Sequence, residues 1–221
     1  MLANDDLLTA PEGERVPALH RETQRFFDTQ VSEFKLRGKW IEVDGDENDQ
    51  ILALARMSDI VITPRDMVVP YSENRQTAAQ IGQSCGGPVI VVPPEADVSK
   101  AARRIVVAWA DKREAARVLR DAWPLIEKAD DVSLVTVGAS LKPFEEPLRE
   151  RFARRGQSVR LVEIDGKEAA APDLILDYIA SSGADMLVMG FCGRLRLQQW
   201  LLGGMTSEML ARCPIPLFAS R

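Results

Sequence analysis

Residues 185–206 read DMLVMGFCGRLRLQQWLLGGMT, an apolar run that leads into a loop punctuated by glycines. The run 185–190 is short, apolar and bounded by Asp and Gly, which is typical of a strand buried on both faces of a parallel sheet. The glycines are Gly190 and Gly193 and then, after nine further residues, Gly203 and Gly204. Because glycine adopts positive φ and lets a backbone approach a ligand closely, the spacing predicts a tight loop able to surround an anion.

Strands and helices alternate over the whole second half of the chain. Short apolar or β-branched runs predict strands at 103–109, 131–137, 158–164, 185–190 and 215–220, and apolar residues at helical spacing predict helices at 112–129, 143–156, 171–183 and 204–213. Asp111 stands where the first helix needs an N-cap, and Gly183 where the third needs a C-cap. Strands that alternate with helices pair in parallel through right-handed crossovers, so the second half forms a complete five-stranded α/β unit.

The first half resembles an incomplete copy of this unit. The stretch 49–64 matches 173–190, since each opens a helix with Asp and Ile-Leu and runs to an Asp before a buried strand. The stretch 85–93 matches 213–220, since in both a Cys stands three residues before the Pro that opens the final strand. Two similarities at nearly the same offset predict an internal repeat.

We therefore divide the chain into an incomplete first repeat, residues 1–97, and a complete second repeat, residues 98–221. The helix expected at 18–34 corresponds to that at 143–156, and too little chain precedes it for the opening strand, helix and second strand of a repeat. The opening strand of a doubly wound sheet is central, so its loss predicts a cleft or an exposed edge. Either the gene product is shortened, or a partner chain or a rearrangement fills the gap.

The composition excludes several function classes. A net charge of -5 argues against a nucleic-acid-binding protein, which needs a concentrated basic surface. No stretch approaches the roughly 18 apolar residues of a membrane span, and the N-terminal sequence lacks a secretory signal, so no membrane partner is expected. The three cysteines, Cys85, Cys192 and Cys213, cannot all pair, which fits a cytoplasmic protein. The single histidine, His20, lies in a polar segment, so no metal site is expected.

These features resemble the universal stress protein family, in the tandem form with two repeats per chain. The matching elements are the first strand and helix of the second half, the strand that ends at Gly190, the glycine loop, and the last strand in CPIPLF at 213–218. The resemblance covers 103–221 well and the first half only from about 18 to 93. It implies a Rossmann-like or flavodoxin-like parallel sheet, a role in stress tolerance, and a homodimer in which last strands pair between repeats or subunits.

Some members of this family bind ATP or a related nucleotide, and the glycine loop would be the site. Backbone N–H groups and the positive N-terminal end of the next helix favour an anion there. The candidate cradle for ATP or AMP comprises Gly190, Gly193, Arg194, Gly203, Gly204, Met205 and Thr206. Lys112 and Arg196 offer further positive charge, although a solvated surface position is the favoured interpretation of Lys112, Arg194 and Arg196.

Three departures from the nucleotide-binding members count against a site. Gly204 replaces the Ser or Thr that follows the third glycine of the motif, which leaves Thr206 as the nearest hydroxyl. Ala110 replaces the Asp at the end of the first strand, and Asp111, one place later, points in another direction. The apolar stretch 200–202 inside the loop can pack over the pocket.

The sequence offers no convincing nucleophile and base, and no Walker A or dinucleotide-binding glycine pattern. We therefore expect a non-catalytic stress-response protein that acts through dimerisation, with or without a regulatory nucleotide. The alternative is a nucleotide-switched sensor or weak ATP hydrolase that uses the 190–206 loop, and a third interpretation is an adaptor that docks partners at its incomplete repeat. The first repeat has Pro64 at the position of Gly190, so it is expected to hold no nucleotide.

Overall fold

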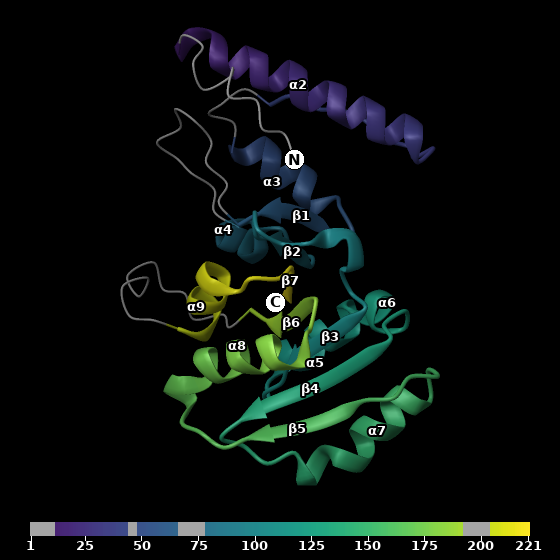
Figure 1. Ribbon diagram of the computed structural model, residues 1–221, viewed down its shortest axis with the longest axis vertical. Helices are drawn as coiled ribbons and strands as arrows, with labels where there is room; N and C mark the ends of the chain where they lie inside the picture. Colours follow the sequence, from purple (N-terminus) through teal and green to yellow (C-terminus); the bar gives the residue numbers. More distant parts are fainter. Residues whose placement is uncertain (1–11, 44–47, 66–77, 192–203) are drawn as a thin grey trace. The chain divides into compact units, whose positions relative to one another are not determined.

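The structure is a computed structural model that describes residues 12–43, 48–65, 78–191 and 204–221. The chain divides into two compact units, Met1–Asp44 and Gly45–Arg221. The strands of the described residues all lie in the second unit and form one seven-stranded sheet in the order β1-β2-β7-β6-β3-β4-β5 (Figure 1). The prediction of an α/β fold with a mostly parallel sheet is confirmed.

The five strands predicted in the second half all form, each within its predicted range. The strands of the sheet are β1 (Val61–Pro64), β2 (Val89–Val92), β3 (Arg104–Ala108), β4 (Asp131–Val137), β5 (Arg160–Ile164), β6 (Met186–Gly190) and β7 (Leu217–Ser220). The helices described in this unit are α3 (Asn48–Arg56), α4 (Ala78–Ser84), α5 (Arg113–Asp121), α6 (Trp123–Ile126), α7 (Glu145–Ala153), α8 (Ala171–Ser182) and α9 (Met205–Arg212).

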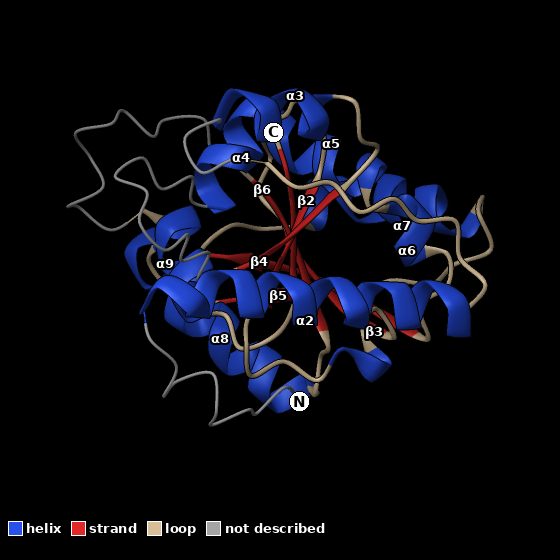
Figure 2. Ribbon diagram, turned by 90° about the horizontal axis from the view of Figure 1, so that it is seen from above, coloured by secondary structure: helices blue, strands red, loops and turns tan. Residues whose placement is uncertain are grey.

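Adjacent strands are parallel throughout the sheet except for β2 and β7, which run antiparallel. Ile90 of β2 lies opposite Phe218 of β7. The last strand of the first half therefore pairs with the last strand of the second half within one chain. Figure 2 shows the strands fanned out by the twist of the sheet.

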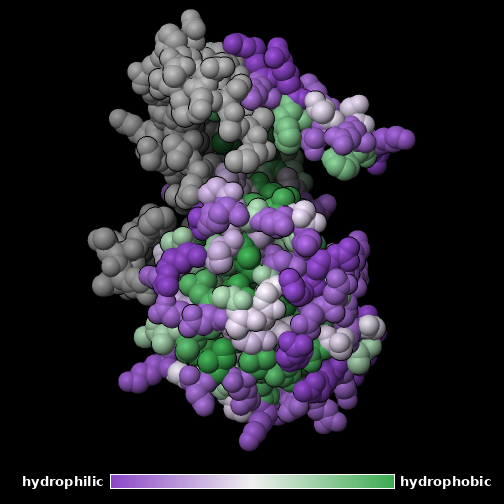
Figure 3. Space-filling view, in the orientation of Figure 1, coloured by the Kyte–Doolittle hydropathy of each residue, from purple (hydrophilic) through white to green (hydrophobic). Residues whose placement is uncertain are grey.

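Helices cover both faces of the sheet, as strands with apolar residues on both sides require. One apolar layer packs against α3, α4, α8 and α9, and the other against α5, α6 and α7. Neighbours on β6 alternate between these layers: Leu187 belongs to the first and Val188 to the second, and both are fully buried. Other hydrophobic side chains reach the surface among hydrophilic ones, as in most proteins (Figure 3).

Two local predictions at helix ends have different outcomes. The long helix predicted after β3 is interrupted at Ala122, because Pro124 has no N–H to continue the ladder of hydrogen bonds. The N-cap of α5 is Lys112, whose side chain makes no capping bond, so the prediction that Asp111 caps this helix is wrong. The C-cap prediction is confirmed, because Gly183 ends α8 with a φ of 64° in the left-handed region.

The strand β1 lies at the edge of the sheet, and its outer side pairs with no described strand. Ile62 in β1 is 66% exposed and Ile60 just before it is 37% exposed. Their counterparts in the sequence comparison, Val188 and Met186, are 0% and 3% exposed. The exposed edge predicted for the incomplete half is therefore present.

The first unit consists of α2 (Glu12–Glu33) and the segment that follows it. Beyond α2, Lys35 has a φ of 51° and the chain turns back, so that the ring of Trp40 packs 5.6 Å from that of Phe27, measured between centroids. Residues 36–43 form no strand. No helix among the described residues combines the length and apolar character that crossing a membrane requires.

Candidate functional site

A cavity of about 380 Å³ opens at the carboxyl ends of β3, β4 and β6. Its walls are residues 108–112 after β3, residues 136–139 after β4, and parts of α8, together with Gly190 and Met205. Ligands of parallel α/β sheets bind at this end of the strands, and the volume lies in the usual range of small-molecule sites. This cavity is the candidate functional site.

Gly190 ends β6 at the point where α5 crosses closest to it. A Cβ added at Gly190 would lie 2.8 Å from the backbone carbon of Glu114 and 2.9 Å from its Cβ. Real Cβ atoms do not come so near, so the close packing of α5 on β6 requires glycine here. Gly190 thus has a structural role in addition to lining the cavity.

The start of α9 carries three of the predicted cradle residues. Gly204 is the N-cap, with an extended φ of -105°, and Met205 is the first helical residue and lines the cavity. Thr206 is 5% exposed and is not part of the cavity wall. The other predicted cradle residues, Gly193, Arg194 and Gly203, lie outside the described part of the chain, as does Arg196.

Four charged side chains line the cavity: Asp111, Lys112, Glu114 and Glu168. The ammonium group of Lys112 lies 3.8 Å from a carboxylate oxygen of Glu168, and both side chains are largely exposed. Arg113 donates a 2.7 Å hydrogen bond to Glu114 and thereby holds the pKa of that carboxyl below its usual value. The described wall therefore carries more negative than positive charge, which disfavours a multiply charged anion against it.

The remaining wall is mainly apolar. Ala108, Val137, Ile175 and Met189 line it, with Trp109 at the end of β3. The indole N–H of Trp109 is buried and has no hydrogen-bond partner among the described residues. An apolar wall with few polar groups suits a flat heterocyclic ligand whose ring is held by packing.

The wall offers binding groups, and the described residues contain no group of three His, Cys, Asp or Glu side chains that could hold a metal ion. Trp109, Glu114 and Glu168 line the wall but were not predicted to do so from the sequence. An aromatic residue at the carboxyl end of the first strand was a usable signal for Trp109, because strand ends line sites in this fold. Glu168 offered no such signal, since its approach to Lys112 depends on the path of the chain before α8.

The chain matches a known protein family. The model of the universal stress protein family matches residues 76–221. No curated protein matches the sequence.

Two solved structures share the fold over most of the chain. The crystal structure of a universal stress protein from Archaeoglobus fulgidus matches with a TM-score of 0.74 at 15% identity and covers 97% of this chain and 84% of its own. A putative universal stress protein from Pseudomonas aeruginosa matches with a TM-score of 0.60 at 15% identity, covering 91% of this chain and 78% of its own. At these identities the likeness concerns the fold.

Proposed function

From the premise that this chain belongs to the universal stress protein family, we propose that it is a non-catalytic stress-response protein that binds a regulatory adenine nucleotide, AMP or ATP. The observation that carries the proposal is the cavity of about 380 Å³ at the carboxyl ends of β3, β4 and β6. Its apolar wall suits the base, and the start of α9 offers backbone N–H groups for a phosphate.

The charges of the cavity wall predict which of the two nucleotides binds more tightly. Asp111, Glu114 and Glu168 repel added phosphate charge, and Lys112 alone of the described wall residues attracts it. AMP is therefore expected to bind at least as tightly as ATP, with most of the affinity coming from the base and ribose.

Titration calorimetry with adenosine, AMP and ATP tests the proposal. Micromolar binding of AMP is expected in the unmodified protein. Ala139→Trp, at an exposed wall position, should fill the cavity and remove this binding. Ala153→Trp, at an exposed alanine of α7 outside the wall, is the matched control and should bind AMP normally. No heat at millimolar AMP, or equal binding by both variants, would contradict the proposal.

The alternative function is a weak ATP hydrolase or nucleotide-switched sensor. A single-turnover assay with Mg²⁺ and ATP separates it from the proposal. We expect ATP to be recovered intact, whereas hydrolysis that disappears in Gly193→Val would favour the alternative.

We also propose that the protein acts as a homodimer. The last strands β2 and β7 already pair with each other, so a second copy has to use another surface. The edge of β1 has an apolar, exposed Ile62, whereas the opposite edge strand β5 carries Arg160 and Glu163. Unguarded apolar edges favour strand pairing and charged edges oppose it. Sedimentation should show a dimer that dissociates in Ile62→Lys, and a monomer at all concentrations would count against the proposal.

A further inference from the structure

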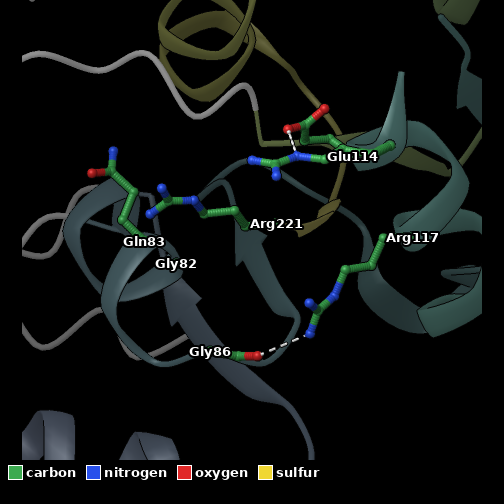
Figure 4. Close-up of a pocket in the computed structure, with 7 residues that line it drawn as sticks. Gly82, Gln83, Gly86, Glu114, Arg117 and Arg221 are labelled. Carbon is green, nitrogen blue, oxygen red and sulfur yellow. Dashed lines mark hydrogen bonds and ion pairs between the residues drawn. The ribbon is translucent and has the colours of Figure 1, made fainter. Parts of the chain in front are cut away.

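A second cavity, of about 350 Å³, lies beside the first in the unit that holds the sheet. It is lined by Gly82, Gln83 and Gly86 of α4 and the turn after it, by Arg113, Glu114 and Arg117 of α5, and by Arg221 after β7 (Figure 4). Glu114 lines both cavities and so stands between them. Nothing in the proposed nucleotide site uses the three arginines.

The charge of this second cavity is opposite to that of the first. Three guanidinium groups face one carboxylate, that of Glu114. Glu114 is bonded to Nε of Arg113 at 2.7 Å, which leaves both terminal nitrogens of Arg113 without a described partner. Arginine stays protonated at every relevant pH, so the excess of positive charge is permanent.

The positive charge of Arg117 is only weakly offset by the groups around it. Its Nε lies 3.4 Å from a carboxylate oxygen of Asp121, and its Nη2 donates to the carbonyl oxygen of Gly86 at 3.4 Å. Asp121 also accepts a hydrogen bond from the hydroxyl of Ser220 and lies 3.7 Å from Nε of Arg120. The carboxylate of Asp121 is thus shared among three donors, so it offsets the positive charge of Arg117 only in part.

Arg221 forms no ion pair or hydrogen bond with any described side chain or backbone group. Figure 4 shows its side chain extending toward Gln83, while Arg117 extends toward Gly86. The side-chain amide of Gln83 likewise has no described hydrogen-bond partner, and the residue is only partly exposed. The cavity therefore holds a guanidinium and an amide whose donors are free to bind a ligand.

We propose that this cavity is an anion site for a phosphoryl group, either free or carried on a small molecule. The planar fork of arginine binds two phosphoryl oxygens at once, and a dianion offsets the repulsion among Arg113, Arg117 and Arg221 better than a monoanion does. The volume of about 350 Å³ exceeds what one phosphate ion fills, so pyrophosphate or a phosphate monoester fits better.

Titration calorimetry with pyrophosphate, inorganic phosphate, glycerol 3-phosphate and acetate tests the site. Pyrophosphate or the monoester should bind, acetate should not, and affinity should fall when NaCl is raised from about 50 to about 200 mM. Arg221→Ala and Gln83→Glu should each weaken binding by about tenfold or more, because one removes a charged donor and the other adds a carboxylate. Neither side chain has a contact that folding needs, which circular dichroism can verify.

Arg160→Ala is the matched control. It removes the same charge from β5, at the far edge of the sheet, where Arg160 pairs with Asp131 at 3.4 Å. Binding should change by less than about twofold in this variant. AMP binding should be unchanged in Arg221→Ala, so the two cavities can fail independently. Absence of heat with millimolar pyrophosphate, acetate binding as tight as phosphate, or equal losses in Arg221→Ala and Arg160→Ala would overturn the proposal.

Discussion

The ring of Phe191, the first residue after β6, packs directly on Gly82 of α4. A Cβ added at Gly82 would lie 2.6 Å from Cζ of Phe191, and Phe191 is 1% exposed. The start of the glycine loop in the second half is thus held by a helix of the first half. The two halves meet here as well as at the pair of β2 and β7.

Gly82→Ala should therefore destabilise the protein. Alanine favours a helix over glycine by about 1 kcal/mol, but its Cβ would overlap the buried ring of Phe191, and overpacking costs about 1–3 kcal/mol. Urea unfolding measures the difference. Gly87→Ala is the control, because a Cβ there would make an ordinary contact at 3.6 Å with the carbonyl oxygen of Ser58. A Gly82→Ala protein more stable than Gly87→Ala would show that α4 can shift away from Phe191.

Gly190→Ala should separate α5 from β6, because the new Cβ would lie 2.8 Å from the backbone carbon of Glu114. Backbone atoms cannot rotate away, so we expect a loss of at least about 2 kcal/mol in the free energy of unfolding. In Gly204→Ala the new Cβ has no described heavy atom within 4 Å, and the variant should cost no more than about 1 kcal/mol, as an N-cap change. Equal losses in the two variants would contradict the inference that close packing on α5 requires glycine at position 190.

The alternation of strands and helices was predictable from the sequence, because hydrophobic periodicity is local. Gly183 ended α8 as predicted, since glycine relieves the strain of a left-handed residue wherever it occurs. The N-cap of α5 was not predictable in this way. Asp111 has a suitable side chain, but the turn Ala110–Lys112, closed by a 2.7 Å hydrogen bond from the Lys112 N–H, places Lys112 at the cap.

The helices α2 and α7 end in a similar way. Lys35 after α2 has a φ of 51°, and Gly156 after α7 has a φ of 75°. In each case the next N–H donates to the carbonyl five residues earlier, at 2.9 Å after α2 and 3.1 Å after α7. After α7 the chain continues as β5, which pairs with β4. The first half has no counterpart of β4 among the described residues, so its segment 36–43 has no neighbour to pair with and forms no strand.

The walls of the two cavities depended on tertiary structure. Glycine spacing predicted the place of the first cavity, because strand ends converge in a parallel sheet. The convergence of Arg113, Arg117 and Arg221 arises only once β7 is paired in the sheet and α5 packs against it. In the sequence Arg113 and Arg117 belong to a charged helix face, for which solvent exposure is the ordinary interpretation.

Trp109→Phe should cost less than Trp123→Phe. The buried indole N–H of Trp109 has no partner in the described part of the chain, so its removal breaks no described hydrogen bond, and we expect a change of less than about 1 kcal/mol. Trp123 packs edge-on against Phe152 at 5.2 Å and lies 4.5 Å below the guanidinium of Arg155, and losing these contacts should cost about 1–2 kcal/mol. Thermal unfolding gives both values. A larger loss for Trp109→Phe would mean that its indole fills space that phenylalanine leaves empty.

The fluorescence of Trp109 can report ligand binding in the first cavity. Because Trp109 lines the cavity, a bound nucleotide should alter its fluorescence. AMP titration of the unmodified protein should give a saturable change that is absent in Trp109→Phe and present in Trp123→Phe. A change that persists in Trp109→Phe would place the ligand near another tryptophan.

Cys213, between α9 and β7, should make stability fall at alkaline pH. Burial raises the pKa of its thiol from an ordinary 9.0 to about 11. The unfolded chain therefore releases this proton at lower pH than the folded protein does. The stabilising contribution is complete below pH 9.0 and is lost as the pH rises toward about 11.

Urea unfolding from pH 8 to pH 11 should show a steeper decline for the unmodified protein than for Cys213→Ala, whose lower stability should depend less on pH. Parallel declines in the two proteins would assign the alkaline effect to other groups.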